Sequence, residues 1–141
     1  MTKNKYDVFI SYSVQDHSSA HELAEALKQK GIIAWMDPGT EPGKKLADQI
    51  EKALKESKVF LFLLSPDFLT SKWTNFELGV ALSKAAVAPD TRIIPLAIKP
   101  LNKKSLPGPL RDLEVIDMKN ISSGQAAEKV VQMLEEVPVG T

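Results

Sequence analysis

The chain has 141 residues, of which 43% are hydrophobic and 26% are charged, so one domain with one core is expected. It contains no cysteine, which excludes disulfides, thiolate catalysis and thiolate zinc sites and fits a reducing cytoplasm. A formal net charge of zero predicts no bulk attraction to nucleic acid or to an acidic membrane. The longest apolar run, residues 59–64, is too short to span a bilayer, and no signal peptide is apparent. We expect a single domain over residues 1–141, with its core at about 6–136.

The first strand and helix are clear from periodicity. Residues 6–11 (YDVFIS) predict a strand buried on both faces, as in parallel sheets. A helix follows, with Ser19 or Asp16 as its N-cap and Gly31 as its C-terminal stop. Its apolar stripe consists of Ala20, Leu23, Ala24 and Leu27.

The alternation of strand and helix continues. Residues 32–36 predict a second strand and 59–64 a third, with a loop rich in Pro and Gly at 37–45. Between them lies a helix marked by Leu46, Ile50, Ala53 and Leu54. Ser65 before Pro66 predicts a short helical turn, and Ser71 is expected to cap a longer helix that runs to about residue 86.

The C-terminal third predicts two more strands and a helix. Residues 92–98 form the fourth strand, where Pro95 indicates a bulge or a place near the sheet edge. A loop at 99–110 and a short strand at 114–117 precede the last helix, marked by Ala126, Val130, Met133 and Leu134. This order predicts an α/β fold with a parallel sheet. Ligands bind beyond the carboxyl ends of such strands, here residues 12–19, 37–45, 65–77 and 99–110.

Trp73 and Glu77 are four residues apart and share one face of the predicted helix. The best apolar stripe of that helix, through Leu78, Ala81, Leu82 and Ala85, leaves the pair at its margin. An indole beside a carboxylate can form a stacking platform with an acid next to it. Spacing alone favours the plainer interpretation, a half-buried Trp and a solvated Glu.

Other candidate motifs are weaker. The loop at 37–45 could clamp a charged ligand, but it lacks the spacing and the hydroxyl of a phosphate-binding loop. An ordinary surface loop is an equally good interpretation. His17 and His21 have helical metal-pair spacing, but no third ligand is evident, so solvated or capping histidines are favoured. No serine lies in a GxSxG elbow. The lysines of the 99–104 segment are expected to be solvated; they are Lys99, Lys103 and Lys104.

Four segments of the chain form an ordered set of motifs. They are residues 6–13 (YDVFISYS) with Asp16, 35–37 (WMD) with 41–43 (EPG), the Ser65-Pro66 to Ser71-x-Trp73-x3-Glu77-Leu78 frame, and 94–96 (IPL). In this order they resemble the signature boxes of TIR (Toll/interleukin-1 receptor) domains, and the likeness runs from about Tyr6 to Met133. The resemblance implies a flavodoxin-like, three-layer fold with a five-stranded parallel sheet in the order 2-1-3-4-5. It also implies either a prokaryotic-type enzyme that cleaves NAD⁺ or a non-catalytic module that associates with other TIR domains. The family's enzymes carry a glutamate where Glu77 stands, which favours the enzyme.

The resemblance implies a role for each site residue. Glu77 is the expected catalytic carboxylate, Trp73 would stack on nicotinamide, and the family enzymes need neither metal nor cofactor besides NAD⁺ as substrate. Tyr12 and Ser13 are expected on the adenosine or diphosphate side, and Ser11 and Asp37 are expected as further substrate-binding residues. The expected gate is Glu41, Gly43, Lys44 and Lys45. Some family enzymes have an aromatic residue at the end of the loop, where this chain has Lys44-Lys45. Some have arginines after the first strand, where this chain has Ser13-Val14. Head-to-tail self-association would activate the enzyme. A receiver-like phosphoacceptor domain is disfavoured, because Leu64-Ser65 replaces its aspartate.

Overall fold

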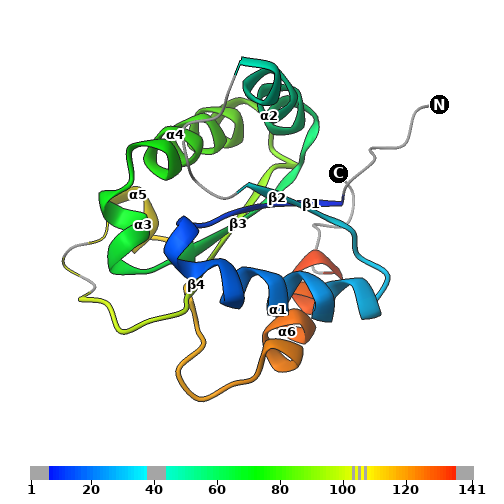
Figure 1. Ribbon diagram of the computed structural model, residues 1–141, viewed down its shortest axis with the longest axis vertical. Helices are drawn as coiled ribbons and strands as arrows, with labels where there is room; N and C mark the ends of the chain where they lie inside the picture. The colour runs from blue at the N-terminus through cyan, green and yellow to red at the C-terminus, as the bar shows by residue number, and fades with distance from the viewer. Residues whose placement is uncertain (1–6, 38–43, 103, 105, 107, 136–141) are drawn as a thin grey trace.

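A computed structural model describes residues 7–37, 44–102, 104, 106 and 108–135. Five parallel strands form one sheet in the order β2-β1-β3-β4-β5, as expected for a flavodoxin-like fold (Figure 1). The strands are β1 (Val8–Ser11), β2 (Ala34–Asp37), β3 (Val59–Leu64), β4 (Arg92–Ala97) and β5 (Ile116–Asp117). The helices are η1 (Val14–Asp16, 3-10), α1 (His17–Gln29), α2 (Lys44–Glu56), α3 (Pro66–Thr70), α4 (Lys72–Val87), α5 (Gly108–Arg111) and α6 (Ser123–Glu135).

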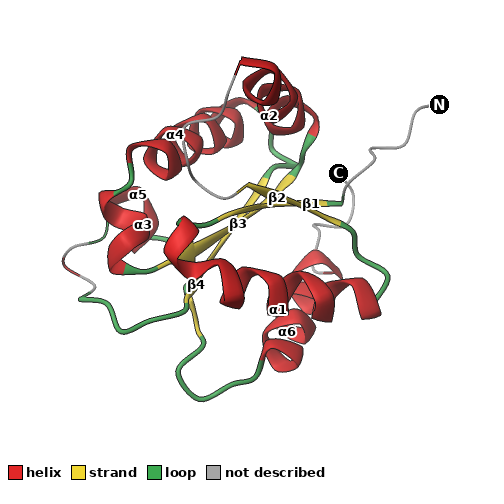
Figure 2. Cartoon of the chain, in the orientation of Figure 1, coloured by secondary structure: helices red, strands yellow, loops and turns green. Residues whose placement is uncertain are grey.

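Helices cover both faces of the sheet, which gives three layers (Figure 2). Successive side chains of a strand point to opposite faces, so β1 and β3 supply alternate residues to two cores. Val8, Ile10 and Leu61 pack with α1 and α6 on one face, whereas Phe9 and Phe60 pack with α2 and α4 on the other. The predicted burial of the first strand on both faces is confirmed.

Gly31 ends α1 as predicted. Its φ of +82° is a left-handed conformation that favours glycine. The amide of Gly31 donates to the carbonyl of Lys28, and that of Ile32 to the carbonyl of Leu27, both at 2.9 Å. These two bonds satisfy carbonyls that the helix end would otherwise leave open.

The start of α1 differs from one of the two expectations. The helix begins at His17, so Ser19 lies inside its first turn and is not the cap. Asp16 occupies the N-cap position, but its side chain makes no capping hydrogen bond. Its carboxylate instead binds Ser65, which follows β3, and Lys99, which lies just beyond β4.

Both serine caps around α3 and α4 are confirmed. Ser65 Oγ accepts the amide proton of Phe68 at 3.1 Å, and Ser71 Oγ accepts that of Thr74 at 3.3 Å. The buried Thr74 hydroxyl donates to the carbonyl of Phe68 at 2.7 Å, across the break between the helices. The start of α4 is therefore fixed to the end of α3.

The far end of α4 is tied to α2. Lys84 Nζ donates to the carbonyl of Lys55 at 2.5 Å and also contacts the carbonyls of Leu54 and Ser57. The ammonium thus satisfies carbonyls at the end of α2. Burial lowers the pKa of Lys84 from its usual value.

The last part of the sheet bears on two expectations. Pro95 lies in β4, an inner strand, where it pairs with Phe62 of β3; the β4–β5 ladder covers only Leu96 and Ala97, so Pro95 has no partner in β5. The segment expected as a loop at 99–110 leads into α5, which begins at Gly108. The expected bounds of the third strand, residues 59–64, are confirmed, and the other strand boundaries differ from the expected ones by at most two residues.

Candidate active site

Glu77 is fully buried, contrary to the plainer expectation of a solvated glutamate. It lies on the inward face of α4; among the side chains of this helix that the structure describes, the other buried ones are Thr74, Leu78 and Ala81. Leu78 and Ala81 belong to the apolar stripe preferred from the sequence, while Phe76 of the rejected stripe is 53% exposed. The carboxylate therefore sits within the buried face of the helix, directed at the sheet.

Ser11 holds this carboxylate. It is the last residue of β1, is fully buried, and donates its hydroxyl proton to Glu77 Oε1 at 2.7 Å. A hydrogen bond to an ionised group is worth about 1.5–3 kcal/mol, roughly twice a neutral one. The contact places a carboxylate at the carboxyl end of the sheet, where parallel α/β folds bind ligands.

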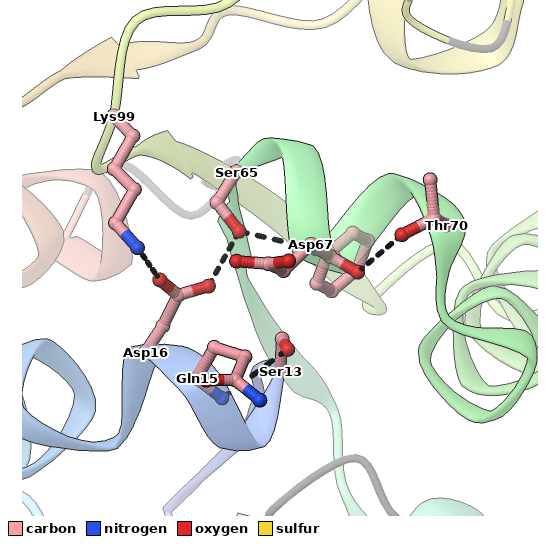
Figure 3. Close-up of polar contacts among 8 residues, drawn as sticks. Ser13, Gln15, Asp16, Ser65, Asp67, Thr70 and Lys99 are labelled. Carbon is pink, nitrogen blue, oxygen red and sulfur yellow. Dashed lines mark hydrogen bonds and ion pairs between the residues drawn. The ribbon is translucent and has the colours of Figure 1, made fainter.

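A second polar cluster lies along the same edge, formed by Asp16, Ser65 and Lys99 (Figure 3). The Asp16 side chain is fully buried; its Oδ1 is 2.6 Å from Lys99 Nζ, and its Oδ2 accepts a short hydrogen bond from Ser65 Oγ. Ser65 at the same time caps α3. The cluster thus joins the segments that follow β1, β3 and β4.

Charge reinforces this cluster. The hydrogen bond from Lys99 to Asp16, and the attraction between the two charges, raise the pKa of Lys99 above its usual value. Lys99 keeps 44% of its side chain exposed, so the pair is buried at one end and open to solvent at the other. The expectation that Lys99 is merely solvated is wrong.

Tyr12 and Ser13 lie where the strand leads into η1. Tyr12 is 2% exposed, and its hydroxyl is 3.4 Å from His17 Nδ1. Ser13 Oγ accepts the amide proton of Gln15 at 3.4 Å, capping η1. Both residues follow Ser11 directly, so they belong to the same edge as the Ser11–Glu77 contact.

The predicted gate and Asp37 lie only partly in the part of the chain that the structure describes. Asp37 is the last residue of β2, and Lys44 and Lys45 open α2. Glu41 and Gly43 lie outside the described residues. Trp73 lies in the first turn of α4, one turn before Glu77, and its side chain is not described.

The histidines form a pair on α1. The rings of His17 and His21 meet edge to face with centroids 4.2 Å apart, and both residues are exposed. Among the described residues, no group of three or more His, Asp or Glu side chains is arranged to hold a metal ion. In the same residues, no helix has the length and apolar character needed to cross a membrane.

The sequence did not identify Ser65 and Lys99 as site residues. Each directly follows or lies just beyond a strand, at the edge where the carboxyl ends meet. That rule selected their segments but not their side chains. Both side chains bind Asp16, and no local pattern in the sequence predicts that Asp16 is their partner.

The order of the strands agrees with a known family. The family model described as TIR domain matches residues 8–134. The chain belongs to the TIR domain family. The matched residues of this TIR domain include the five strands and both members of the Ser11–Glu77 contact.

Two curated relatives of this TIR domain carry enzyme names. The "Probable 2' cyclic ADP-D-ribose synthase TcpO" of Methanobrevibacter olleyae is 38% identical over 79 residues, covering 55% of this chain and 23% of that protein. The "NAD(+) hydrolase TcpC" of Escherichia coli O6:H1 is 32% identical over 93 residues, covering 64% of this chain and 30% of that protein. The chain spans less than a third of either relative.

A solved structure confirms the fold. The TIR domain of the Toll-related receptor TRR-2 from Hydra magnipapillata superposes with a TM-score of 0.73 at 22% identity. The match covers 94% of this chain and 100% of that one. At this identity the likeness speaks for the fold alone.

Proposed function

We propose that this TIR domain cleaves NAD⁺ at the bond between nicotinamide and ribose, with Glu77 as the catalytic carboxylate. The observation that carries the proposal is the buried Ser11–Glu77 contact at the carboxyl end of the sheet. The printed names of the two relatives, a cyclic ADP-ribose synthase and an NAD⁺ hydrolase, support the same reaction class.

The chemistry needs one carboxylate. As the C–N bond breaks, its electron pair goes to the pyridinium nitrogen and nicotinamide leaves as a neutral molecule. The ribose becomes positively charged, like an oxocarbenium ion, so a fixed negative charge stabilises the transition state. A carboxylate away from water does so more strongly, because nearby charges are screened less. Glu77, buried and oriented by Ser11, meets this requirement.

The nucleophile decides the product. Water that adds to the ribose carbon and loses a proton gives ADP-ribose, whereas attack by a hydroxyl of the substrate itself gives a cyclic isomer. In the proposal Trp73 stacks on the nicotinamide ring. Tyr12 and Ser13 contact the adenosine or diphosphate side, with Ser11 and Asp37 as further substrate-binding residues. The gate consists of Glu41, Gly43, Lys44 and Lys45.

Self-association completes the proposal. Glu77 is fully buried in the single chain, so substrate can reach it only after neighbouring residues move. We therefore assign low activity to the isolated chain and higher activity to a head-to-tail assembly of TIR domains, in which a contact between copies favours the open site. The cytoplasm, where NAD⁺ is abundant, is the proposed location.

The test compares NAD⁺ consumption by the wild-type chain and Glu77→Gln at high protein concentration. We expect the variant to lose about 10²–10³-fold in rate, the usual cost of removing a group that stabilises transition-state charge. Glu128→Gln, at an exposed position on α6, is the matched control and should keep wild-type activity. Chromatography of the products separates ADP-ribose from cyclic isomers.

Two results would contradict parts of the proposal. If the wild-type chain consumes no NAD⁺ in any assembled form, the enzyme is refuted and the domain is a non-catalytic TIR–TIR interaction module. If Glu77→Gln turns over as fast as wild type, the reaction stands but its carboxylate is another residue.

A further inference from the structure

A hollow of about 660 Å³ lies at the carboxyl ends of β4 and β5, next to α5. Its size is within the usual range for a small-molecule site. Leu101, Leu106, Leu113 and Val115 supply an apolar wall, and Leu106 is 5% exposed. The hollow shares no residue with the Ser11–Glu77 contact.

Positive charge dominates the polar part of this pocket. Lys99, Arg111 and Lys119 line it, against a single carboxylate, that of Asp117. The Asp117 carboxylate is also partly engaged, because its Oδ1 accepts the backbone amide proton of Lys119 at 2.9 Å. The pocket thus combines an apolar wall with a net positive rim, although the whole chain has no net charge.

The three cations differ in availability. Lys99 lines the pocket, but its ammonium is already paired with the carboxylate of Asp16. Arg111 and Lys119 are exposed, and no ion pair of either is recorded among the described residues. A guanidinium can bind a phosphate or carboxylate through two parallel hydrogen bonds, and a lysine adds a point charge.

We propose that this pocket binds a small organic anion with an apolar or aromatic body, whose charged group is held by Arg111 and Lys119. The apolar body lies against the leucine and valine side chains. The pocket is distinct from the proposed NAD⁺ site, and the proposal does not depend on catalysis at Glu77. An uncharged apolar molecule cannot form the ionic contacts with Arg111 and Lys119. An inorganic anion cannot pack against the leucine and valine side chains.

Lys99 links this pocket to the proposed active-site edge. An anion that approaches Lys99 competes with Asp16 for the same ammonium, and Asp16 in turn is bonded to Ser65 at the start of α3. Occupancy of the pocket is therefore expected to alter the amide environments of Asp16 and Ser65 as well as those of the lining residues.

The test is a ¹H–¹⁵N NMR titration of the full chain with 1-naphthyl phosphate. We expect saturable shifts at residues 97–101 and 111–119, followed by smaller shifts at Asp16 and Ser65. 1-Naphthol and inorganic phosphate are the control probes: 1-naphthol keeps only the aromatic body, and inorganic phosphate keeps only the charged group. Both should bind at least tenfold more weakly than 1-naphthyl phosphate.

Variants test the rim. Arg111→Ala and Lys119→Ala should each weaken 1-naphthyl phosphate binding about fivefold or more. Lys129→Ala, which removes an exposed lysine of α6 outside the pocket, should not change it. Amide spectra that otherwise match wild type show that each variant is folded.

Several outcomes overturn the proposal. If 1-naphthol binds as tightly as 1-naphthyl phosphate, the charged residues do not contribute and the pocket is only an apolar patch. If inorganic phosphate binds as tightly, the apolar wall does not contribute and binding reflects surface charge alone. Shifts centred on Ser11 and Glu77 place the probe in the active site instead. Shifts at residues 97–101 and 111–119 that depend on protein concentration without any probe identify a second copy of the chain as the occupant.

Discussion

Ser11 and Glu77 lie 66 positions apart in the chain, and the hydroxyl of Ser11 donates to the carboxylate of Glu77 at 2.7 Å. Ser11 ends β1, and Glu77 lies on α4, the second helix after the neighbouring strand β3. Both are fully buried. The contact orients the carboxylate of Glu77 at the carboxyl end of β1.

Ser11→Ala should lower kcat for NAD⁺ cleavage by about tenfold to a hundredfold and change KM little. The lost hydrogen bond to an ionised group is worth about 1.5–3 kcal/mol, and each 1.36 kcal/mol is tenfold in rate. The measurement is the initial rate of NAD⁺ loss across substrate concentrations.

Ser57→Ala is the matched control for that experiment. Ser57 is also buried, and its hydroxyl donates to the carbonyl of Ala53 at 2.6 Å, at the end of α2. Its loss should reduce stability without a specific loss of kcat. Equal kcat in Ser11→Ala and wild type would show that the hydroxyl does not position the catalytic carboxylate.

Specific activity should rise with protein concentration. Because Glu77 is enclosed in the single chain, a form stabilised by contact between copies is expected to admit substrate. NAD⁺ consumption per mole of chain, followed over about a hundredfold range of concentration beside light scattering, checks this expectation. A constant specific activity over a range in which light scattering detects assembly would contradict it.

Lys99→Met should lower the melting temperature at pH 7 and remove a pH dependence at alkaline pH. Hydrogen bonding to Asp16 raises the pKa of Lys99 in the folded chain. The unfolded chain titrates at the ordinary value of about 10.4. The stabilisation is therefore fully present below about pH 10.4 and is lost as pH rises through the higher folded-state pKa.

Thermal melts of wild type and Lys99→Met between pH 7 and pH 11.5 measure this difference. The gap in melting temperature should stay constant up to about pH 10 and then close. Lys129→Met, at an exposed position, is the control and should leave the curve unchanged. A gap that does not close in alkali would show that Lys99 stabilises the chain by packing and not by charge.

Two glycine substitutions should have opposite effects on stability. Gly31→Ala forces a Cβ into a left-handed conformation, at φ +82°, and should cost about 1 kcal/mol. Gly79→Ala, in the middle of α4 with no atom within 4 Å of the new Cβ, should stabilise by about 0.5–1 kcal/mol. Urea unfolding of both variants gives the comparison, and the same sign for both would contradict the argument.

Much of the fold could be predicted from the sequence, because local periodicity is enough to define it. The apolar density of residues 59–64, the Gly31 stop and the serine caps at Ser65 and Ser71 depend on neighbours within a few positions. The alternation of strand and helix then fixed a parallel sheet. Boundaries were less secure, as at α1, where Asp16 and Ser19 were both acceptable caps by local rules.

The candidate site was only half predicted. The family frame around Ser71, Trp73 and Glu77 selects α4 and its glutamate as the candidate, and that role stays a prediction; spacing alone favours a solvated side chain, whereas Glu77 is fully buried. The burial of Glu77 depends on which face of α4 meets the sheet, and an apolar stripe places a residue at its margin only approximately.

By itself the sequence determined the fold class, the order of the elements and the glutamate as candidate carboxylate, since each follows from local chemistry or from the motif frame. Only the tertiary structure decided the partners: Ser11 for Glu77, and Ser65 and Lys99 for Asp16. These contacts join residues 49 or more positions apart, and they form where parallel strands end side by side. The chain brings those ends together only when the sheet is assembled, so no local pattern could have selected them.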